Sequence, residues 1–212
     1  MKPLTPTTAE RFEQLAAEAQ RCRACPSMDG RVRVLSSANG PCPAEIMLIG
    51  EAPGRLGAER TGQPFSGDES SRRLEHLIGA AGWGRSDVFI TNAVLCNPQD
   101  AGGRNRSPRA EEVANCSGWL TRQIELVDPI LVVALGRVAL AALGRVRHHG
   151  LSLADAGSVP VRWGKRRLAV AYHPSARAAI HRPIERQLAD FAALGAWWRP
   201  RAGANAESAA CR

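Results

Sequence analysis

Four short apolar runs, separated by segments of helical periodicity, constrain the fold of this 212-residue chain more than any other feature. They have the length of strands and comprise residues 45–50, 88–94, 130–136 and 167–172. Runs without polar alternation are typical of parallel strands buried on both faces of a sheet. Apolar residues recur at helical spacing in the other segments, at 8–21, 69–81, 109–127, 138–143 and 183–198. We therefore predict an α/β fold, a three-layer α/β/α sandwich around a four-stranded, mostly parallel sheet.

The chain shows no internal repeat and no domain boundary, and its length fits one domain. We predict a single domain over residues 1–199 and a disordered tail over residues 200–212. The apolar runs are far shorter than the roughly 20 residues that a bilayer-spanning helix needs. Glutamates interrupt the first 20 residues, so we expect no signal peptide and a soluble, unexported protein.

The chain is basic, with 28 Lys and Arg against 20 Asp and Glu and a formal net charge of +8. Such a charge is expected of a nucleic-acid-binding protein, although many basic proteins bind no nucleic acid. Aromatic residues make up only 5% of the chain, which argues against a large stacking platform for single strands.

Six cysteines in a chain without an export signal argue against a disulfide framework. Cys22 and Cys25 form a CxxC motif, and two thiolates at this spacing can face one metal ion or cluster from a single turn. Cys96 and Cys116 follow much later, so a site of four thiolates would join the N-terminus to the middle of the chain. A redox CxxC should follow a strand, whereas this one follows a helical segment. The pattern favours a cluster or zinc.

In a parallel sheet the ligand site lies outside the carboxyl ends of the strands. This rule selects the segments that follow the four apolar runs, at residues 50–68, 92–108, 136–137 and 173–177. Three of the four hold most of the unusual polar residues. We therefore expect these residues to converge on one site.

The motifs in these segments resemble those of a known enzyme family. The chain reads Gly-Glu-Ala-Pro-Gly from residue 50, Arg-Thr-Gly-Gln-Pro-Phe-Ser-Gly-Asp-Glu-Ser from residue 60, Thr-Asn-Ala-Val-Leu-Cys-Asn-Pro from residue 91 and Tyr-His-Pro-Ser-Ala-Arg from residue 172. In this order, and with the four cysteines, they resemble the iron–sulfur branches of the uracil-DNA glycosylase superfamily. The first motif is similar to family 4, and the second and fourth are similar to family 5.

The resemblance implies a monofunctional DNA glycosylase that hydrolyses the N-glycosidic bond of uracil in DNA for base excision repair. The partners would be uracil-containing DNA, the abasic-site product and free uracil, with a monomeric protein in the bacterial cytosol and no membrane. The resemblance also implies a structural [4Fe–4S] cluster on Cys22, Cys25, Cys96 and Cys116, and it assigns no ligand role to Cys42 or Cys211.

The resemblance further implies roles for the residues that would hold the base. Phe65 would stack on the flipped base, Asn92 would read the uracil edge, and Gly50 would border the base. His173 would hydrogen-bond uracil O2 as charge develops there. Asp68 fills the acidic position of family 5 and could orient the water, while Glu51 fills that of family 4. Which carboxylate matters more stays open, and Asp68 also precedes a predicted helix, where an acid is favoured in any case.

Contacts to DNA would come from the loops. Ser175 would contact a phosphate, and Arg177 could enter the base stack where other members use an apolar wedge. Arg104 and Arg106 could hold the DNA backbone. The loop at residues 102–108 lacks the nucleophilic histidine of a related branch that traps its DNA covalently, so we expect ordinary turnover.

Three alternatives remain at this stage. The enzyme could excise a broader range of deaminated bases, including hypoxanthine and xanthine. The chain could instead be a non-catalytic iron–sulfur module that binds DNA lesions, or a redox protein that uses its CxxC motif.

Overall fold

The computed structural model describes residues 6–209, and the side chains of residues 6–199. Within the described residues, five strands form one sheet in the order β2-β1-β3-β5-β4. The strands are β1 (Ile46–Gly50), β2 (Val88–Asn92), β3 (Leu131–Leu135), β4 (Val161–Trp163) and β5 (Arg166–Ala171). Strands β2, β1, β3 and β5 are parallel, and β4 is antiparallel to β5.

The prediction of four strands was therefore wrong, because it did not include β4. This strand is three residues long and lies at the edge of the sheet, with Val161 and Arg162 exposed and only Trp163 buried. A strand this short, with one buried residue, gives no periodicity that a sequence pattern can detect. The α/β class and the mostly parallel sheet are confirmed.

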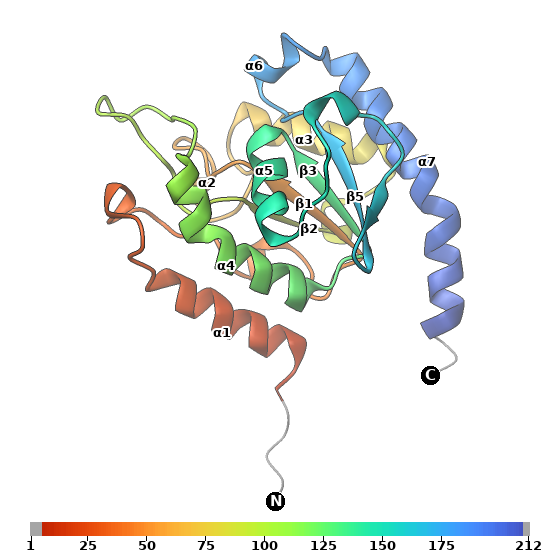
Figure 1. Cartoon of the computed structure of the whole chain (residues 1–212), viewed down its shortest axis with the longest axis horizontal. Coiled ribbons are helices and arrows are strands. Elements are labelled where there is room, and N and C mark those ends of the chain that lie inside the picture. The colour runs from red at the N-terminus through yellow and green to blue at the C-terminus, as the bar shows by residue number, and fades with distance from the viewer. Residues whose placement is uncertain (1–5, 210–212) are drawn as a thin grey trace, which may run out of the picture.

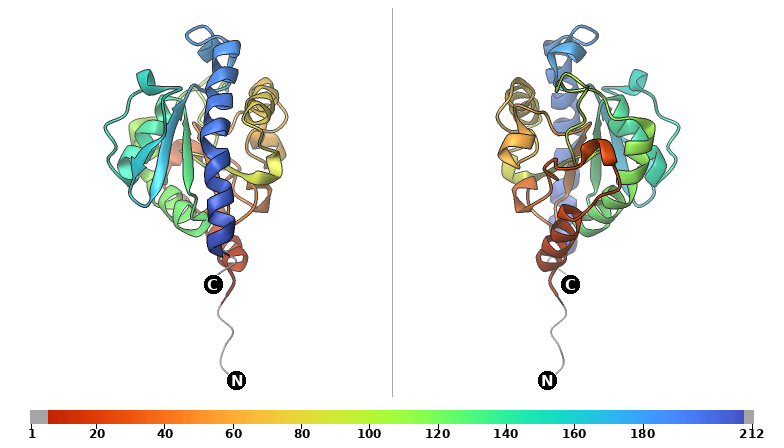
Figure 2. Two further views of the ribbon diagram at one scale, coloured as in Figure 1. Left: turned by 90° about the vertical axis from the view of Figure 1, so that its right-hand side faces the viewer. Right: turned by 90° about the vertical axis from the view of Figure 1, so that its left-hand side faces the viewer.

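Helices cover both faces of the sheet and complete the predicted sandwich (Figure 1). Their bounds are α1 (Thr8–Gln20), α2 (Ala58–Thr61), α3 (Glu69–Ala80), α4 (Ala110–Val127), α5 (Arg137–Val146), α6 (Ala176–Ala179) and α7 (Ile184–Ala209). Helices α1, α4 and α5 pack on one face, and α3 and α7 pack on the other (Figure 2).

Alternate residues of each parallel strand enter different cores, as β1 illustrates. Met47 and Ile49 pack with α1, α4 and α5, whereas Ile46 and Leu48 pack with α3 and α7. Burying one such side chain stabilises the fold by roughly 1.5–3 kcal/mol. The uninterrupted apolar character of the strands follows from this burial on both sides.

The last helix is longer than predicted. The backbone of α7 is helical through Ala209, across most of the segment for which we predicted a disordered tail from residue 200. The segment is rich in alanine, the residue with the highest helix propensity. Residues 210–212, including Cys211, lie outside the described residues, and the division into one domain and a tail stays a prediction.

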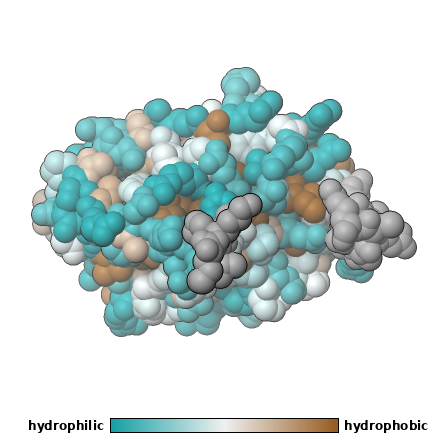
Figure 3. Space-filling model, turned by 90° about the horizontal axis from the view of Figure 1, so that it is seen from below, coloured by the Kyte–Doolittle hydropathy of each residue, from teal (hydrophilic) through white to brown (hydrophobic). Residues whose placement is uncertain are grey.

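Parallel strands bring their carboxyl ends to one edge of the sheet, at the end of the molecule where α6 lies (Figure 1). Gly50 and Asn92 are register partners at this edge, and Gly136 follows β3 beside them. The opposite end of the molecule presents a mainly hydrophilic face (Figure 3). Between residues 6 and 209 we find no helix with the length and apolar character needed to cross a membrane.

Candidate active site

A pocket of about 730 Å³ opens at the carboxyl edge of the sheet. It brings together predicted residues from three of the four strand-end segments, namely Glu51, Phe65, Asp68, Asn92, Arg106, His173, Ser175 and Arg177. Gly50 lies directly behind Phe65 and Asn92 and is not itself part of the lining. The expected convergence of the strand-end segments is thus observed.

The absence of a side chain at Gly50 leaves room for its two neighbours. A Cβ atom there would lie 2.5 Å from Asn92 Oδ1 and 2.6 Å from a ring carbon of Phe65. Asn92 is 2% exposed, and its Oδ1 atom is buried with no hydrogen-bond partner within the described structure. Leaving such an acceptor unpaired costs about 1–3 kcal/mol. An unpaired buried acceptor in a pocket wall is available to a hydrogen-bond donor that enters the pocket.

Phe65 is held in an unusual backbone conformation. Its φ of 48° lies in the left-handed region, which a bulky side chain adopts at a cost on the order of 1–3 kcal/mol. The ring is buried and lies 5.6 Å from the His173 ring, centroid to centroid, at an interplanar angle of 36°. The strained turn thus places the Phe65 ring beside His173, which comes from the segment after β5, in the wall of the same pocket.

The imidazole of His173 is uncharged at neutral pH. Burial lowers its pKa to about 4, although the nearby Asp68 carboxylate acts in the opposite direction. A neutral imidazole carries one N–H donor and one acceptor. His173 can therefore donate a hydrogen bond to an oxygen in the pocket without bringing a full positive charge to it.

Asp68 serves the helix and the pocket at the same time. Its Oδ1 accepts a hydrogen bond of 2.9 Å from the Ser71 backbone N–H at the start of α3, so the side chain is an N-cap. Its Oδ2 lies toward the loop, where a Cβ on Gly57 or Gly54 would approach it to 2.5 or 2.9 Å. The two interpretations of Asp68 from the sequence are therefore compatible.

The second carboxylate, Glu51, also lines the pocket and is half-buried. Its backbone carbonyl accepts a hydrogen bond from the Val94 N–H, which ties the loop after β1 to the loop after β2. The geometry thus brings both carboxylates, Glu51 and Asp68, to one pocket.

Two asparagines that we had not predicted shape the rim. Asn97 is 1% exposed and donates to the Pro53 carbonyl at 2.6 Å and to Asn105 Oδ1 at 3.0 Å. Asn105 Oδ1 also accepts from the Arg55 backbone N–H at 3.1 Å. These bonds join the Gly-Glu-Ala-Pro-Gly loop to the loop at residues 97–108. The position of Asn97 directly after Cys96, inside the third motif, was the one sequence feature that could have identified it as a site residue.

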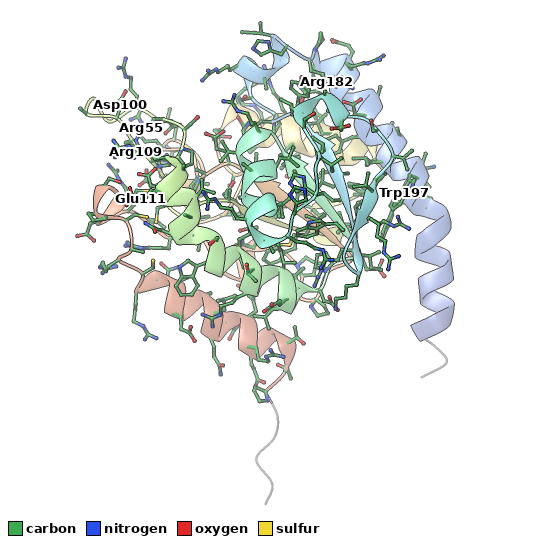
Figure 4. All side chains as sticks on the ribbon, viewed as in Figure 1. Arg55, Asp100, Arg109, Glu111, Arg182 and Trp197 are labelled. Carbon is green, nitrogen blue, oxygen red and sulfur yellow. The ribbon has the colours of Figure 1, made fainter. Side chains whose placement is uncertain are left out.

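The four predicted DNA-binding residues have different environments. Ser175 is the N-cap of α6, and Arg177 is exposed at the pocket rim. Arg104 lies outside the pocket lining, is 80% exposed and pairs with Asp100 at 3.1 Å. Figure 4 shows Arg55, Asp100 and Arg109 at the same end of the molecule, beside the start of α4.

Arg106 is engaged inside the protein. Its two terminal nitrogens bond both oxygens of Glu112 at 2.7 and 2.6 Å, and its Nε donates to the Gln99 carbonyl at 3.0 Å. Few of its donors remain for a phosphate. Arg106 is thus paired with a carboxylate from α4, and its contact with the DNA backbone stays a prediction.

Glu112 connects the pocket rim to the N-terminal cysteine loop. Besides Arg106, it accepts hydrogen bonds from Ser27 Oγ at 2.8 Å and from the Arg109 N–H at 2.7 Å. The pKa of Glu112 is lowered to about 2, chiefly by its hydrogen bonds with the Arg106 guanidinium. One turn later on α4, Asn115 donates to the Ala24 carbonyl at 3.0 Å, in the CxxC segment.

A second, smaller cavity contains the four cysteines predicted to bind a cluster. It is lined by Cys22, Ala24, Cys25, Met28, Arg33, Cys96, Asn115 and Cys116 and has a volume of about 20 Å³. Burial raises the pKa of Cys96 to about 11 and that of Cys116 to about 12. Among the side chains that the structure describes, residues 6–199, no three His, Cys, Asp or Glu groups are close enough to hold a single metal ion. Cys42 is not part of the lining of this cavity.

Comparison with known proteins gives consistent matches. The profile of the Uracil DNA glycosylase superfamily matches residues 38–197. A Type-4 uracil-DNA glycosylase of Thermotoga maritima is 34% identical over 80% of this chain and 84% of its own. One from Archaeoglobus fulgidus is 33% identical over 88% and 92%. A Type-5 uracil-DNA glycosylase of Pyrobaculum aerophilum is 38% identical over 64% and 63%.

The Glu112 ion pair predicts an acid-dependent loss of stability. The folded-state pKa of about 2 lies below the ordinary 4.5 of a glutamate, so its contribution is present above pH 4.5 and is lost as the pH falls through 2. We expect Glu112→Gln to lower the free energy of unfolding at pH 7 by roughly 3 kcal/mol and to flatten the acid dependence. Urea unfolding at several pH values measures both. Glu18→Gln, which breaks the exposed pair with Arg122, should change little; an equal loss in both variants would contradict the assignment.

The burial of His173 predicts a second acid dependence. Its pKa of about 4 lies below the ordinary 6.5, so the unfolded chain binds the proton more tightly, and this group makes the fold less stable as the pH falls from 6.5 to 4. We expect the His173 ring signals in NMR spectra to stay unchanged from pH 8 to about 5.5. Asp68→Asn should lower the midpoint further, because the carboxylate raises it. A midpoint near 6.5 would show that the ring is solvated.

Proposed function

Because the chain belongs to the uracil-DNA glycosylase superfamily, we propose that it hydrolyses the N-glycosidic bond of uracil in DNA and leaves an abasic site for base excision repair. The observation that carries the proposal is the buried, unpaired Oδ1 of Asn92 in the wall of a pocket that also contains Phe65 and His173. A flipped uracil supplies the N–H that this acceptor lacks.

Uracil and cytosine differ at the edge that Asn92 would read. Uracil presents an N3–H donor beside the O4 acceptor, which matches the acceptor and donor of an amide, whereas cytosine presents the reverse pattern. The Phe65 ring gives the extruded base a stacking surface in place of its lost neighbours. Gly50 keeps the space behind both residues free of side-chain atoms.

Hydrolysis needs stabilisation of the departing uracil anion. The neutral His173 would donate its N–H to uracil O2, where negative charge develops as the bond to the sugar breaks. Asp68 Oδ2 or the Glu51 carboxylate would orient the attacking water and stabilise the positive charge that develops on the sugar. Both carboxylates line the same pocket, which supports either assignment.

No lysine lines the pocket among the described residues, which supports a monofunctional enzyme without a Schiff-base step. Lys165 pairs with Asp128, near the start of β5 and away from the pocket edge. Lys2 lies outside the described residues.

DNA would approach the pocket along its rim. Arg177 is exposed there and available to enter the base stack, and Ser175 lies at the start of α6 to contact a phosphate. Arg104 offers an exposed guanidinium for the DNA backbone. Arg106 would act mainly by holding the rim through Glu112.

We propose a [4Fe–4S] cluster as the cofactor. Four cysteine side chains around one cavity are the donor set of such a cluster, and each thiolate binds a different iron, so the sulfurs need not converge on a single ion. A buried guanidinium and an amide donor, which reaches Cys25 Sγ at 3.5 Å, lie beside the sulfurs and suit an anionic group. When bound, the cluster would tie the N-terminal loop to α4 and the segment after β2. We further propose that the protein acts on DNA as a monomer in the cytosol.

The first test is excision from defined DNA. We expect protein purified without oxygen to act on end-labelled oligonucleotides with one uracil opposite guanine, opposite adenine or unpaired, and strand cleavage should appear only after alkali. Asn92→Asp should lower uracil excision by about 100-fold or more and weaken discrimination against cytosine, because it removes the amide donor. Tight DNA binding without cleavage by the wild type would favour a non-catalytic lesion-binding protein. Unchanged uracil excision by Asn92→Asp would remove this residue from base recognition.

Asp68 both caps α3 and lines the pocket, and the right substitutions can test its charge separately from its capping hydrogen bond. Asparagine caps helices as well as aspartate does, so Asp68→Asn should keep the melting temperature while kcat falls by about 100-fold or more. Asp68→Ala should lose activity and also about 1 kcal/mol of stability. Glu51→Gln is the parallel test of the other carboxylate. Full activity of Asp68→Asn beside an inactive Glu51→Gln would move the catalytic role to Glu51.

A further inference from the structure

Arg33 is a buried arginine without a counter-charge. It is 9% exposed and lines the cysteine cavity. Its two terminal nitrogens donate to the backbone carbonyls of Arg31 and Cys22, whereas its Nε is buried without a partner in the described part of the chain. No carboxylate forms an ion pair with it among residues 6–199. A buried charge left unpaired costs several kcal/mol, so this position calls for an anion.

The neighbouring cysteine sulfurs carry negative charge when they bind metal. Cys96 and Cys116 are buried and line the same cavity as Arg33. Metal binding removes the thiol protons and leaves four negative sulfurs around the cavity. Arg33 is the one cationic side chain among the described residues that line it. The charge missing around Arg33 and the charge created by ligation are therefore complementary.

We propose that Arg33 neutralises the thiolate-bound cluster and donates its Nε–H to a cluster or cysteine sulfur, and thereby retains the cluster and sets its reduction potential. This inference rests on the proposed cofactor and adds a residue that is neither a ligand nor part of the pocket. Hydrogen bonds and charges around the sulfurs are general determinants of cluster potential and metal affinity.

Arg31 provides a matched control. It lies two residues away, carries the same charge and pairs with Glu59 at 3.4 Å with its side chain 35% exposed. It is not part of the cavity lining. Removing its charge changes the formal charge of the protein by the same amount without changing the cavity wall.

The test compares wild type, Arg33→Gln, Arg33→Lys and Arg31→Gln, all purified without oxygen. We expect Arg33→Gln to release iron to a chelator about 10- to 100-fold faster than wild type. Its reduction potential, from a dithionite titration with mediators, should be more negative, because losing a positive charge favours the less negative oxidised cluster. Arg33→Lys restores the charge without the fork of donors and should be intermediate, while Arg31→Gln should match wild type.

Metal-free protein separates this role from simple packing. If Arg33 served only to tie the carbonyls of residues 22 and 31, Arg33→Gln would destabilise the metal-free and the loaded protein equally. We expect Arg33→Gln to lower the thermal stability of the loaded form more than that of the metal-free form, because only the loaded form adds the negative charge of a cluster to the carbonyl contacts. If Arg33→Gln does not fold, the same comparison of metal-free and loaded protein is made with Arg33→Lys.

Iron release and potential equal to wild type in the Arg33 variants, or equal destabilisation of both forms, would overturn the role of Arg33. Wild-type protein that excises uracil but holds no iron would refute the cofactor, and with it this inference, while leaving the glycosylase function intact.

Discussion

Burial of the parallel sheet on both faces is the constraint on which the rest of the molecule depends. Every residue of β1 and β3 is buried, so the polar groups that act on a ligand concentrate where these strands end. Because the strands are parallel, the ends of β1, β2, β3 and β5 meet at one edge, and loops that are distant in sequence build one pocket there. The fold therefore sets the position of the site, and the individual residues there set which reaction it can catalyse.

The pocket keeps several features that a chain selected only for stability would avoid. Asn92 has an unpaired buried acceptor, Phe65 has a left-handed backbone, and His173 is held neutral by burial. Each of these features lowers the stability of the free protein, and apolar burial in the two cores on either side of the sheet offsets this loss. Groups fixed in advance need not reorganise when the base enters, which is how a preorganised site lowers a barrier.

Local apolar runs were enough to predict the four parallel strands. The individual pocket residues followed from the family resemblance of the motifs at the strand ends. Contacts between distant segments could not be predicted in this way. Ser27 and Glu112 meet across 85 positions, and neither belongs to a motif that names the other. For the same reason, the sequence did not predict that Asn97 lies at the pocket rim or that Arg106 pairs with Glu112. Strand β4 was missed for a different reason, since three residues at an edge leave no periodic signal.

The N-cap at Asp68 has a consequence for how this sequence can drift. Selection at this position acts on two properties at once, a short side chain that caps α3 and a negative charge in the pocket. Asparagine, serine and threonine keep the first, and glutamate keeps the second, but its longer side chain is not among the preferred caps. Aspartate alone among the standard residues satisfies both demands. A lineage that relied on the carboxylate at position 51 instead would release position 68 from the charge requirement, and the helix cap would then be free to vary among the small polar residues.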